Sequence, residues 1–181
     1  MAWSAPMTAV ANSIFTAAQF NQFVRDNLNE TAPAKAVNVG GYFVATGVNA
    51  IAERTAGDDF VNAGEDTTST SFTDLATPGP AITKTTGTSA LVAVYGLVSN
   101  DTAGVSALMS YAVTGATSAA ASDTRSVTYQ PGSVAAARSI RASAVTLHTG
   151  LTAGSNTFTA KYRVTGGTGT FNNRRIAVLP L

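Results

Sequence analysis

The sequence predicts a mainly β protein, in which a short N-terminal segment with one α-helix and a small hairpin precedes an antiparallel, jelly-roll-like β-sandwich. Strand-like runs separated by turn residues recur from about residue 66 to residue 181, roughly seven or eight of them, with no helical window between. Threonine contributes 27 of the 181 residues, and its β-branched side chain fits a pleated strand. Helical spacing of apolar residues occurs near the N-terminus, ahead of these runs.

Charged residues are scarce, and this limits the function classes that the chain can serve. They make up only 12% of the sequence, about half of the usual share, and the net charge is +1. A phosphate-binding surface needs clustered Lys and Arg, so we expect no nucleic-acid partner. No apolar run reaches the roughly 18 residues of a membrane span, so we expect no membrane insertion. The chain has no cysteine, which excludes disulfides and thiol chemistry.

The first 13 residues form an apolar arm, and a helix is predicted to follow it over residues 16–32. Trp3 lies in the arm, where an aromatic side chain of this size is expected to find a partner. Thr16 and Gln19 have the spacing of a capping box, and Phe15 and Phe20 have the spacing of a hydrophobic staple. Pro33 is expected to end the helix.

One face of the predicted helix is apolar. Phe20, Phe23, Val24 and Leu28 follow each other at the spacing of a single helical stripe. A helix of about four turns is marginal in water by itself, so this stripe needs a partner. The partner can be the sandwich of the same chain, sister helices in a trimer, or the surface of a larger assembly. The candidate contact residues, which would anchor the chain in the last case, are Trp3, Phe15, Phe20, Phe23, Val24 and Leu28.

The rest of the chain is divided by its composition. A hairpin is predicted over residues 41–54, which would complete an N-terminal anchor of residues 1–55. Residues 56–65 are expected to be a linker before the sandwich of residues 66–181. The acidic residues of this region are expected to be solvated, and a metal site at Asp58, Asp59, Glu65 and Asp66 stays open as an alternative.

Within the sandwich region, the alternation of apolar residues identifies individual strands. The run 89–98 is apolar on both faces, which is typical of a central strand. The run 156–165 alternates apolar and polar residues most regularly, as a half-buried strand does. Further strands are predicted over the ranges 72–76, 81–85, 105–114 and 170–179.

No residue pattern indicates catalysis, so the chain is expected to be neither an enzyme nor a cofactor protein. His148 is the single histidine, and no nucleophile motif or neighbouring acid accompanies it in the sequence. Five arginines could line a basic face, although surface or inter-subunit pairing is expected for them. The glycine-rich run 166–169 resembles a phosphate loop, but it is expected to be a hairpin turn because strands flank it.

The N-terminal region resembles a recurrent signature of small virion proteins from tailed phages, especially those that infect actinobacteria. The residues that carry this resemblance are Trp3, Pro6, Phe15-Thr16-Ala17-Ala18, Asn21, Val24-Arg25-Asp26-Asn27-Leu28 and the run 41–50. The C-terminal half is similar to the β-sandwich of such proteins over residues 151–158 and 173–178. Members of this group are described as minor tail, head-fibre or capsid-decoration proteins.

The resemblance implies a structural protein of the virion, made in the host cytoplasm. Together with the low charge it favours a homotrimeric surface spike, bound to the major capsid protein or a tail protein and serving as capsid decoration or short head fibre. Two alternatives stay open. One is a minor tail or tail-fibre protein in receptor binding. The other is a lectin-like domain that binds a host cell-surface glycan, for which Tyr129 is the candidate aromatic residue.

Overall fold

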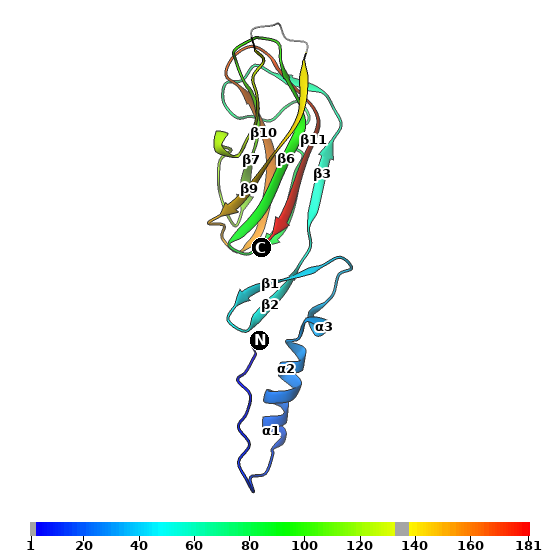
Figure 1. The fold of residues 1–181 in the computed structure, drawn as a ribbon, viewed down its shortest axis with the longest axis vertical. Coiled ribbons are helices and arrows are strands. Elements are labelled where there is room, and N and C mark those ends of the chain that lie inside the picture. Colours follow the sequence, from blue (N-terminus) through cyan, green and yellow to red (C-terminus); the bar gives the residue numbers. More distant parts are fainter. Residues whose placement is uncertain (1–2, 133–137) are drawn as a thin grey trace. The chain divides into compact units, whose positions relative to one another are not determined.

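The computed structural model describes residues 3–132 and 138–181. It divides the chain into two compact units, Met1–Thr55 and Ala56–Leu181. The larger unit is a β-sandwich of two antiparallel sheets, and the smaller one holds short helices and a two-stranded sheet (Figure 1). The predicted fold class, mainly β with an antiparallel sandwich, is therefore confirmed.

Two sheets build the sandwich. The first has the strand order β5-β10-β7-β8, and the second has the order β3-β11-β6-β9, with the short β4 also paired to β11. The strands are β3 (Gly57–Val61), β4 (Glu65–Thr67), β5 (Ala81–Thr86), β6 (Ser89–Asn100), β7 (Ala107–Gly115), β8 (Val127–Tyr129), β9 (Ser139–Thr149), β10 (Gly154–Val164) and β11 (Gly169–Pro180).

The strand order has the jelly-roll topology. If β4 is counted as part of the β3 edge, the sandwich has eight strands in chain order. One sheet then contains the first, eighth, third and sixth of them, which are β3, β11, β6 and β9. The other sheet joins the second, seventh, fourth and fifth. Consecutive strands thus tend to alternate between the sheets, and two Greek keys fold over one another. The turn 165–168 illustrates this, because it joins β10 to β11 in the opposite sheet and is therefore not the hairpin expected there.

The core lies between the sheets and follows the predicted alternation. On β10, Phe158, Ala160, Tyr162 and Val164 are all fully buried. As predicted, β6 is a central strand, with β11 on one side and β9 on the other. Its two faces differ, because alternate residues are buried in the core while the others lie on the outer face of the sheet.

Residues 56–65 are not the linker that their composition suggested. Most of this segment forms β3 and the start of β4, which pair with β11 at the edge of the sheet. The Asp58 carboxylate accepts a hydrogen bond from Arg175 at 2.8 Å, and the Asp59 carboxylate accepts one from the Ala81 amide at 2.8 Å. An edge strand tolerates charged side chains because only one of its sides is paired. The linker prediction was therefore wrong for these residues, although Asp58 is exposed to solvent as predicted.

A second correction concerns residues 72–76, which were predicted to be a strand. They form a loop that makes one isolated β-bridge to the sheet, where the Thr73 amide donates to the Tyr162 carbonyl at 3.0 Å and the Tyr162 amide donates to the Thr73 carbonyl at 2.9 Å. The loop follows β4 and leads to β5, so it crosses from one sheet to the other.

In the N-terminal unit, the predicted helix begins where expected. The Gln19 amide donates to Thr16 Oγ1 at 3.2 Å, and the Thr16 amide donates to the Gln19 side-chain oxygen at 2.9 Å. This is the predicted capping box. The rings of Phe15 and Phe20 meet edge to face with their centres 6.1 Å apart, which completes the predicted staple.

The helix is neither uniform nor as long as the predicted span 16–32. It consists of α1 (Ala17–Phe20), the π-helical turn η1 (Asn21–Arg25) and α2 (Asp26–Asn29), while α3 (Ala32–Lys35) is a separate turn. Pro33 lies in the first turn of α3 rather than at the end of the long helix. Proline is tolerated there because the first amides of a helix have no intrahelical partner.

The predicted hairpin is present. Strand β1 (Tyr42–Gly47) pairs antiparallel with β2 (Ala50–Arg54), and Asn49 adopts a positive φ of 56° in the tight turn between them. The Trp3 amide donates to the Asn49 carbonyl at 3.1 Å, so the start of the arm is tied to the tip of the hairpin. None of the helices in the described ranges is long and apolar enough to cross a membrane.

Candidate functional site: the apolar surface of the N-terminal unit

A buried amide holds the arm against the helix. Asn27 is the one fully buried side chain among the described residues of this unit. Its Oδ1 accepts a hydrogen bond from the Ser4 amide at 2.9 Å, and its Nδ2 donates to the Ser4 carbonyl at 3.2 Å. Nδ2 also donates to the Phe23 carbonyl, one turn earlier, at 3.1 Å. Asn27 thus satisfies both polar groups of one arm residue, as a neighbouring strand would.

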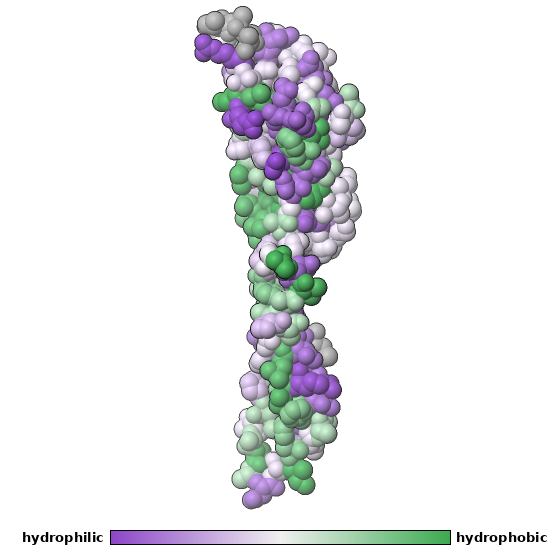
Figure 2. Space-filling model, turned by 90° about the vertical axis from the view of Figure 1, so that its right-hand side faces the viewer, coloured by the Kyte–Doolittle hydropathy of each residue, from purple (hydrophilic) through white to green (hydrophobic). Residues whose placement is uncertain are grey.

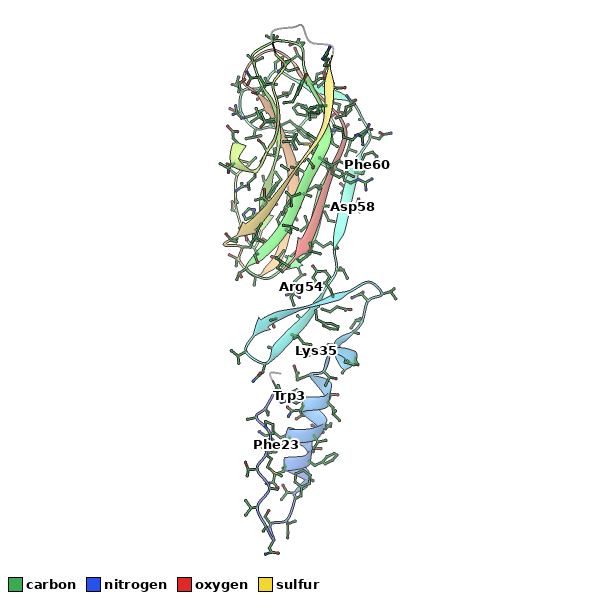
Figure 3. All side chains as sticks on the ribbon, in the orientation of Figure 1. Trp3, Phe23, Lys35, Arg54, Asp58 and Phe60 are labelled. Atoms are coloured by element: carbon green, nitrogen blue, oxygen red, sulfur yellow. The ribbon has the colours of Figure 1, made fainter. Side chains whose placement is uncertain are left out.

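The sequence pattern predicted no contact for Asn27, because the apolar stripe that it defines consists of Phe20, Phe23, Val24 and Leu28. Its spacing of four residues from Phe23 places both on one side of the helix. Figure 3 shows Phe23 on the side of the helix that faces the extended arm. The available signal was a short amide side chain in an otherwise apolar helical stripe, which is typical of a buried, hydrogen-bonded position.

The six residues predicted to attach the chain are only partly brought together. Phe23 and Val24 are half-buried, but Phe20 is 49% exposed and Leu28 is 60% exposed. Phe23 and Val24 lie within the π-helical turn, whereas Phe20 precedes this turn and Leu28 follows it. Phe15 and Trp3 are also open to solvent.

Exposed apolar side chains extend beyond the predicted residues. Figure 2 shows hydrophobic residues open along the surface of this unit. The additional exposed large apolar residues of the unit are Val10, Ile14, Val37, Val39, Phe43 and Val48. Across residues 3–55, no apolar side chain is fully buried. A unit without an apolar core gains little stability from burial, so it needs another surface to cover it.

A shallow hollow lies between the arm and the hairpin within this unit, lined by Trp3, Glu30, Asn49 and Ile51. The Glu30 carboxylate forms an ion pair with Lys35 at 2.6 Å, and this interaction lowers the pKa of Glu30. Lys35 also donates to the Ile51 carbonyl at 3.1 Å, which joins α3 to β2. The polar groups of the hollow therefore hold the helix and the hairpin together.

Replacing Asn27 with Ala is expected to release the arm. The variant loses three hydrogen bonds and leaves the Ser4 amide and carbonyl without their partner. Hydrogen exchange of the Ser4 amide should then accelerate about tenfold or more, because this amide loses its acceptor, while exchange in the sandwich stays unchanged. Asn29, which is exposed on the same helix, is the matched control. Equal protection of the arm in Asn27→Ala and Asn29→Ala would contradict this role.

The sandwich holds the histidine that could have indicated catalysis. His148 lies at the end of β9, is 8% exposed, and places Nδ1 3.1 Å from the Tyr111 hydroxyl. Burial, and secondly the nearby Arg125 guanidinium, lower the pKa of His148. Burial also raises the pKa of Tyr111 to about 12. Asp123, the nearest acid in the sequence, binds Arg163 instead, so the pairing that a hydrolytic triad needs is not formed around His148.

His148 predicts a pH dependence of stability near neutrality. Its pKa in the folded chain lies below the unfolded value of 6.5, so the unfolded chain binds the proton more readily. We expect stability to be constant above about pH 7.5 and to fall as the pH drops through 6.5. Since the chain has one histidine, denaturant unfolding from pH 5 to pH 8 isolates its effect. His148→Gln should flatten the curve in this range, and an unchanged slope would contradict the assignment.

The five arginines do not form a basic face. Arg163 binds Asp123, Arg175 binds Asp58, and the fully buried Arg174 binds Glu65 at 3.1 Å. The remaining two, Arg138 and Arg141, are exposed at the start of β9 and make no ion pair within the described ranges. Pairing across the sandwich surface, expected for these arginines as a group, is thus found for three of them.

The acids at the β3 edge likewise serve the fold. Glu65 accepts hydrogen bonds from the Thr77 side chain and amide, which, together with Arg174, lower the pKa of Glu65. Asp66 is exposed on β4. Over residues 3–132 and 138–181, no three His, Cys, Asp or Glu side chains gather in a way that could hold a metal ion.

Tyr129, the aromatic residue considered for sugar binding, is half-buried at the end of β8 and packs against the core. It is therefore not an exposed platform on which a sugar ring could stack.

Comparisons with known proteins place the fold in context. No protein-family model matches the chain, and no curated protein sequence matches it. Among solved structures, one similar chain comes from the structure of infectious bursal disease virus, Gx strain. The two chains share 11% sequence identity with a TM-score of 0.40, over 80% of this chain. This chain spans 39% of the length of the viral chain.

Proposed function

We propose that this chain is a non-enzymatic structural protein of a bacteriophage virion. In this proposal it forms a trimeric surface spike that the N-terminal unit attaches to the particle, as capsid decoration or a short head fibre. The sandwich is the part that the attached spike displays. The partner of the N-terminal unit is the major capsid protein.

One observation carries this proposal: the N-terminal unit is ordered but has no apolar core of its own. Its apolar side chains are distributed over the surface of the arm, the helix and the hairpin. The sandwich, by contrast, has a continuous buried core of residues from both sheets. The difference is the one expected between a unit that folds on a partner and a unit that folds by itself.

The resemblance to phage virion proteins supports the same division. Its most specific part falls on the arm, the helix and the hairpin, and includes Asn27 and Phe15, which hold the arm and the helix start in place. Residues that preserve an exposed apolar surface in a defined shape are expected where that surface recognises a partner.

Immunogold labelling of intact virions, with an antibody raised against the purified chain, tests the proposal. Gold particles over the head at regular density are expected for capsid decoration. Labelling restricted to the tail tip would favour the receptor-binding alternative and overturn the capsid assignment. Absence of the chain from purified virions would overturn the structural role altogether.

A further inference from the structure

The two outer faces of the sandwich differ in chemical character. The face of β5-β10-β7-β8 carries ion pairs and hydroxyl contacts, among them Lys161 with Asp74 at 2.7 Å and Thr83 with Thr157 at 2.7 Å. All six exposed large apolar residues described for the sandwich unit come from the other sheet or from the residue that follows it. They are Phe60, Leu91, Ile140, Val145, Leu147 and Leu181, of which Ile140 is opposite the buried Val98 and belongs to the core-facing side of β9.

The apolar residues of the second sheet are contiguous on its outer face. Leu147 on β9 is opposite Leu91 on β6, which is opposite Leu179 on β11. The next row toward the middle of the sheet joins Val145, Ala93 and Ala177 in the same way. Val145 is 61% exposed and Leu147 is 55% exposed, although both belong to a regular strand. Water is therefore in contact with two adjacent apolar rows.

Further along the strands, the same outer face carries a row of one arginine between two aromatic residues, Phe60, Arg175 and Tyr95. The Arg175 guanidinium lies 4.9 Å from the centre of the Phe60 ring and 5.6 Å from that of Tyr95. These three residues are cross-strand neighbours on β3, β11 and β6. Phe60 and Asp58 project from β3 in Figure 3. Aromatic residues and arginine are enriched in the cores of protein interfaces.

The two edges of this face carry opposite charges. Asp66 is exposed on β4 at one edge, and Arg141 is exposed on β9 at the other. The cross-strand row from Asp66 passes through Thr170 and Ser99 to Ser139. Arg141 lies two residues from Ser139 on the same face of β9, which is about 7 Å along the strand. Asp66 and Arg141 form no ion pair within the described ranges, and they lie at nearly the same position along the strand direction.

Strand β9 is also a long open edge. It spans Ser139–Thr149 and pairs with β6 on one side only. It contains no proline or lysine, residues that commonly protect such edges from pairing with another chain. Arg141 is its single Lys or Arg.

We propose that the outer face of the β3-β11-β6-β9 sheet is the surface through which copies of this chain associate. The copies are related by rotation about an axis parallel to the strands, and the acidic edge of one copy meets the basic edge of the next. This deepens the proposed function, on which it rests for a copy number of three, by identifying the residues that join the subunits.

The charge arrangement is the reason for choosing a second copy as the occupant. Rotation about an axis parallel to the strands keeps each residue at its own height, so Asp66 of one copy approaches Arg141 of its neighbour. An inverted packing, with the axis perpendicular to the strands, would separate these charges along the strand direction. A repeated contact between two different edges closes into a ring when the rotations from copy to copy add up to one full turn. The apolar rows between the edges then face the axis and lose their contact with water.

The test measures self-association of the full chain by sedimentation equilibrium. We expect Leu147→Asp to be monomeric at concentrations where the unmodified chain associates, because a charge enters the apolar rows. Asp66→Arg and Arg141→Asp should each raise the dissociation constant about tenfold or more, because attraction becomes repulsion. The double variant, with the two charges exchanged, should recover association to within a few-fold of the unmodified chain.

A matched exchange on the opposite face is the control. Asp74→Lys combined with Lys161→Asp exchanges the two charges of an ion pair on the other outer face. This exchange should leave the dissociation constant of self-association unchanged. A monomeric unmodified chain, undisturbed association in Leu147→Asp, or no recovery in the double variant would each overturn the proposed interface. Binding to virions is measured separately with the same variants. A chain that binds particles but does not associate through this face would overturn this inference and leave the proposed function intact.

Discussion

Phe20→Ala combined with Leu28→Ala is expected to weaken binding of the chain to its particle about a hundredfold, while the sandwich keeps its fold. Both side chains are about half exposed in the free chain, so each gains part of the 1.5–3 kcal/mol that full burial of such a side chain provides. A combined loss of about 3 kcal/mol corresponds to roughly two powers of ten in affinity. Co-sedimentation of the variant with particles that lack this protein measures the effect.

Gln22→Ala combined with Asn29→Ala is the matched control, since both residues are exposed and polar on the same helix. Phe23→Ala is a different experiment. Phe23 is half-buried and lies on the side of the helix that faces the arm, so its loss is expected to loosen the arm as well as the docking surface. If the Phe20 and Leu28 double variant bound particles as well as the control pair, attachment would have to use another surface, and the sandwich would be the first candidate.

Replacing Arg174 with Met is expected to destabilise the sandwich by about 1–3 kcal/mol, the usual cost of leaving polar groups at the core without their partner. Arg174 is fully buried on β11, donates to the Thr77 carbonyl at 3.3 Å, and pairs with Glu65 on β4. Its guanidinium also lies 5.3 Å from the centre of the Tyr162 ring. The variant leaves the Glu65 carboxylate beside the core without its cation. Denaturant-induced unfolding of the full chain measures the loss.

Arg175→Met provides the comparison at the adjacent position. The Arg175 side chain is 38% exposed, and its pairing with Asp58 at the surface is worth about 1 kcal/mol or less. A smaller loss for Arg174→Met than for Arg175→Met would show that the buried pair does not hold the loop and β4 to the sheet. Replacing Glu65 and Arg174 together with Met should restore part of the stability, because no buried charge is then left alone.

The sequence by itself determined the features that depend on neighbours along the chain. The capping box of Thr16 and Gln19 depends on residues three apart, and it forms as the sequence predicts. The hairpin depends on a tight turn at Asn49, and the alternation of β10 depends on the two-residue period of a strand. These patterns are local, so the energies that favour them are already present in the amino-acid order.

The tertiary structure decided which residues these elements would meet. The polar composition of β3 is typical of a linker. It forms a strand because it pairs with β11, which lies more than 100 residues later in the chain. The same separation hides the pairing of Arg174 with Glu65. The partners of Asn27 are likewise distant in the sequence, because the Ser4 amide and carbonyl reach it only when the arm folds back along the helix. A contact between distant segments depends on the sheet order and on the path of the loops. Hydrophobic periodicity shows which face of a strand is apolar, and not which strand lies beside it.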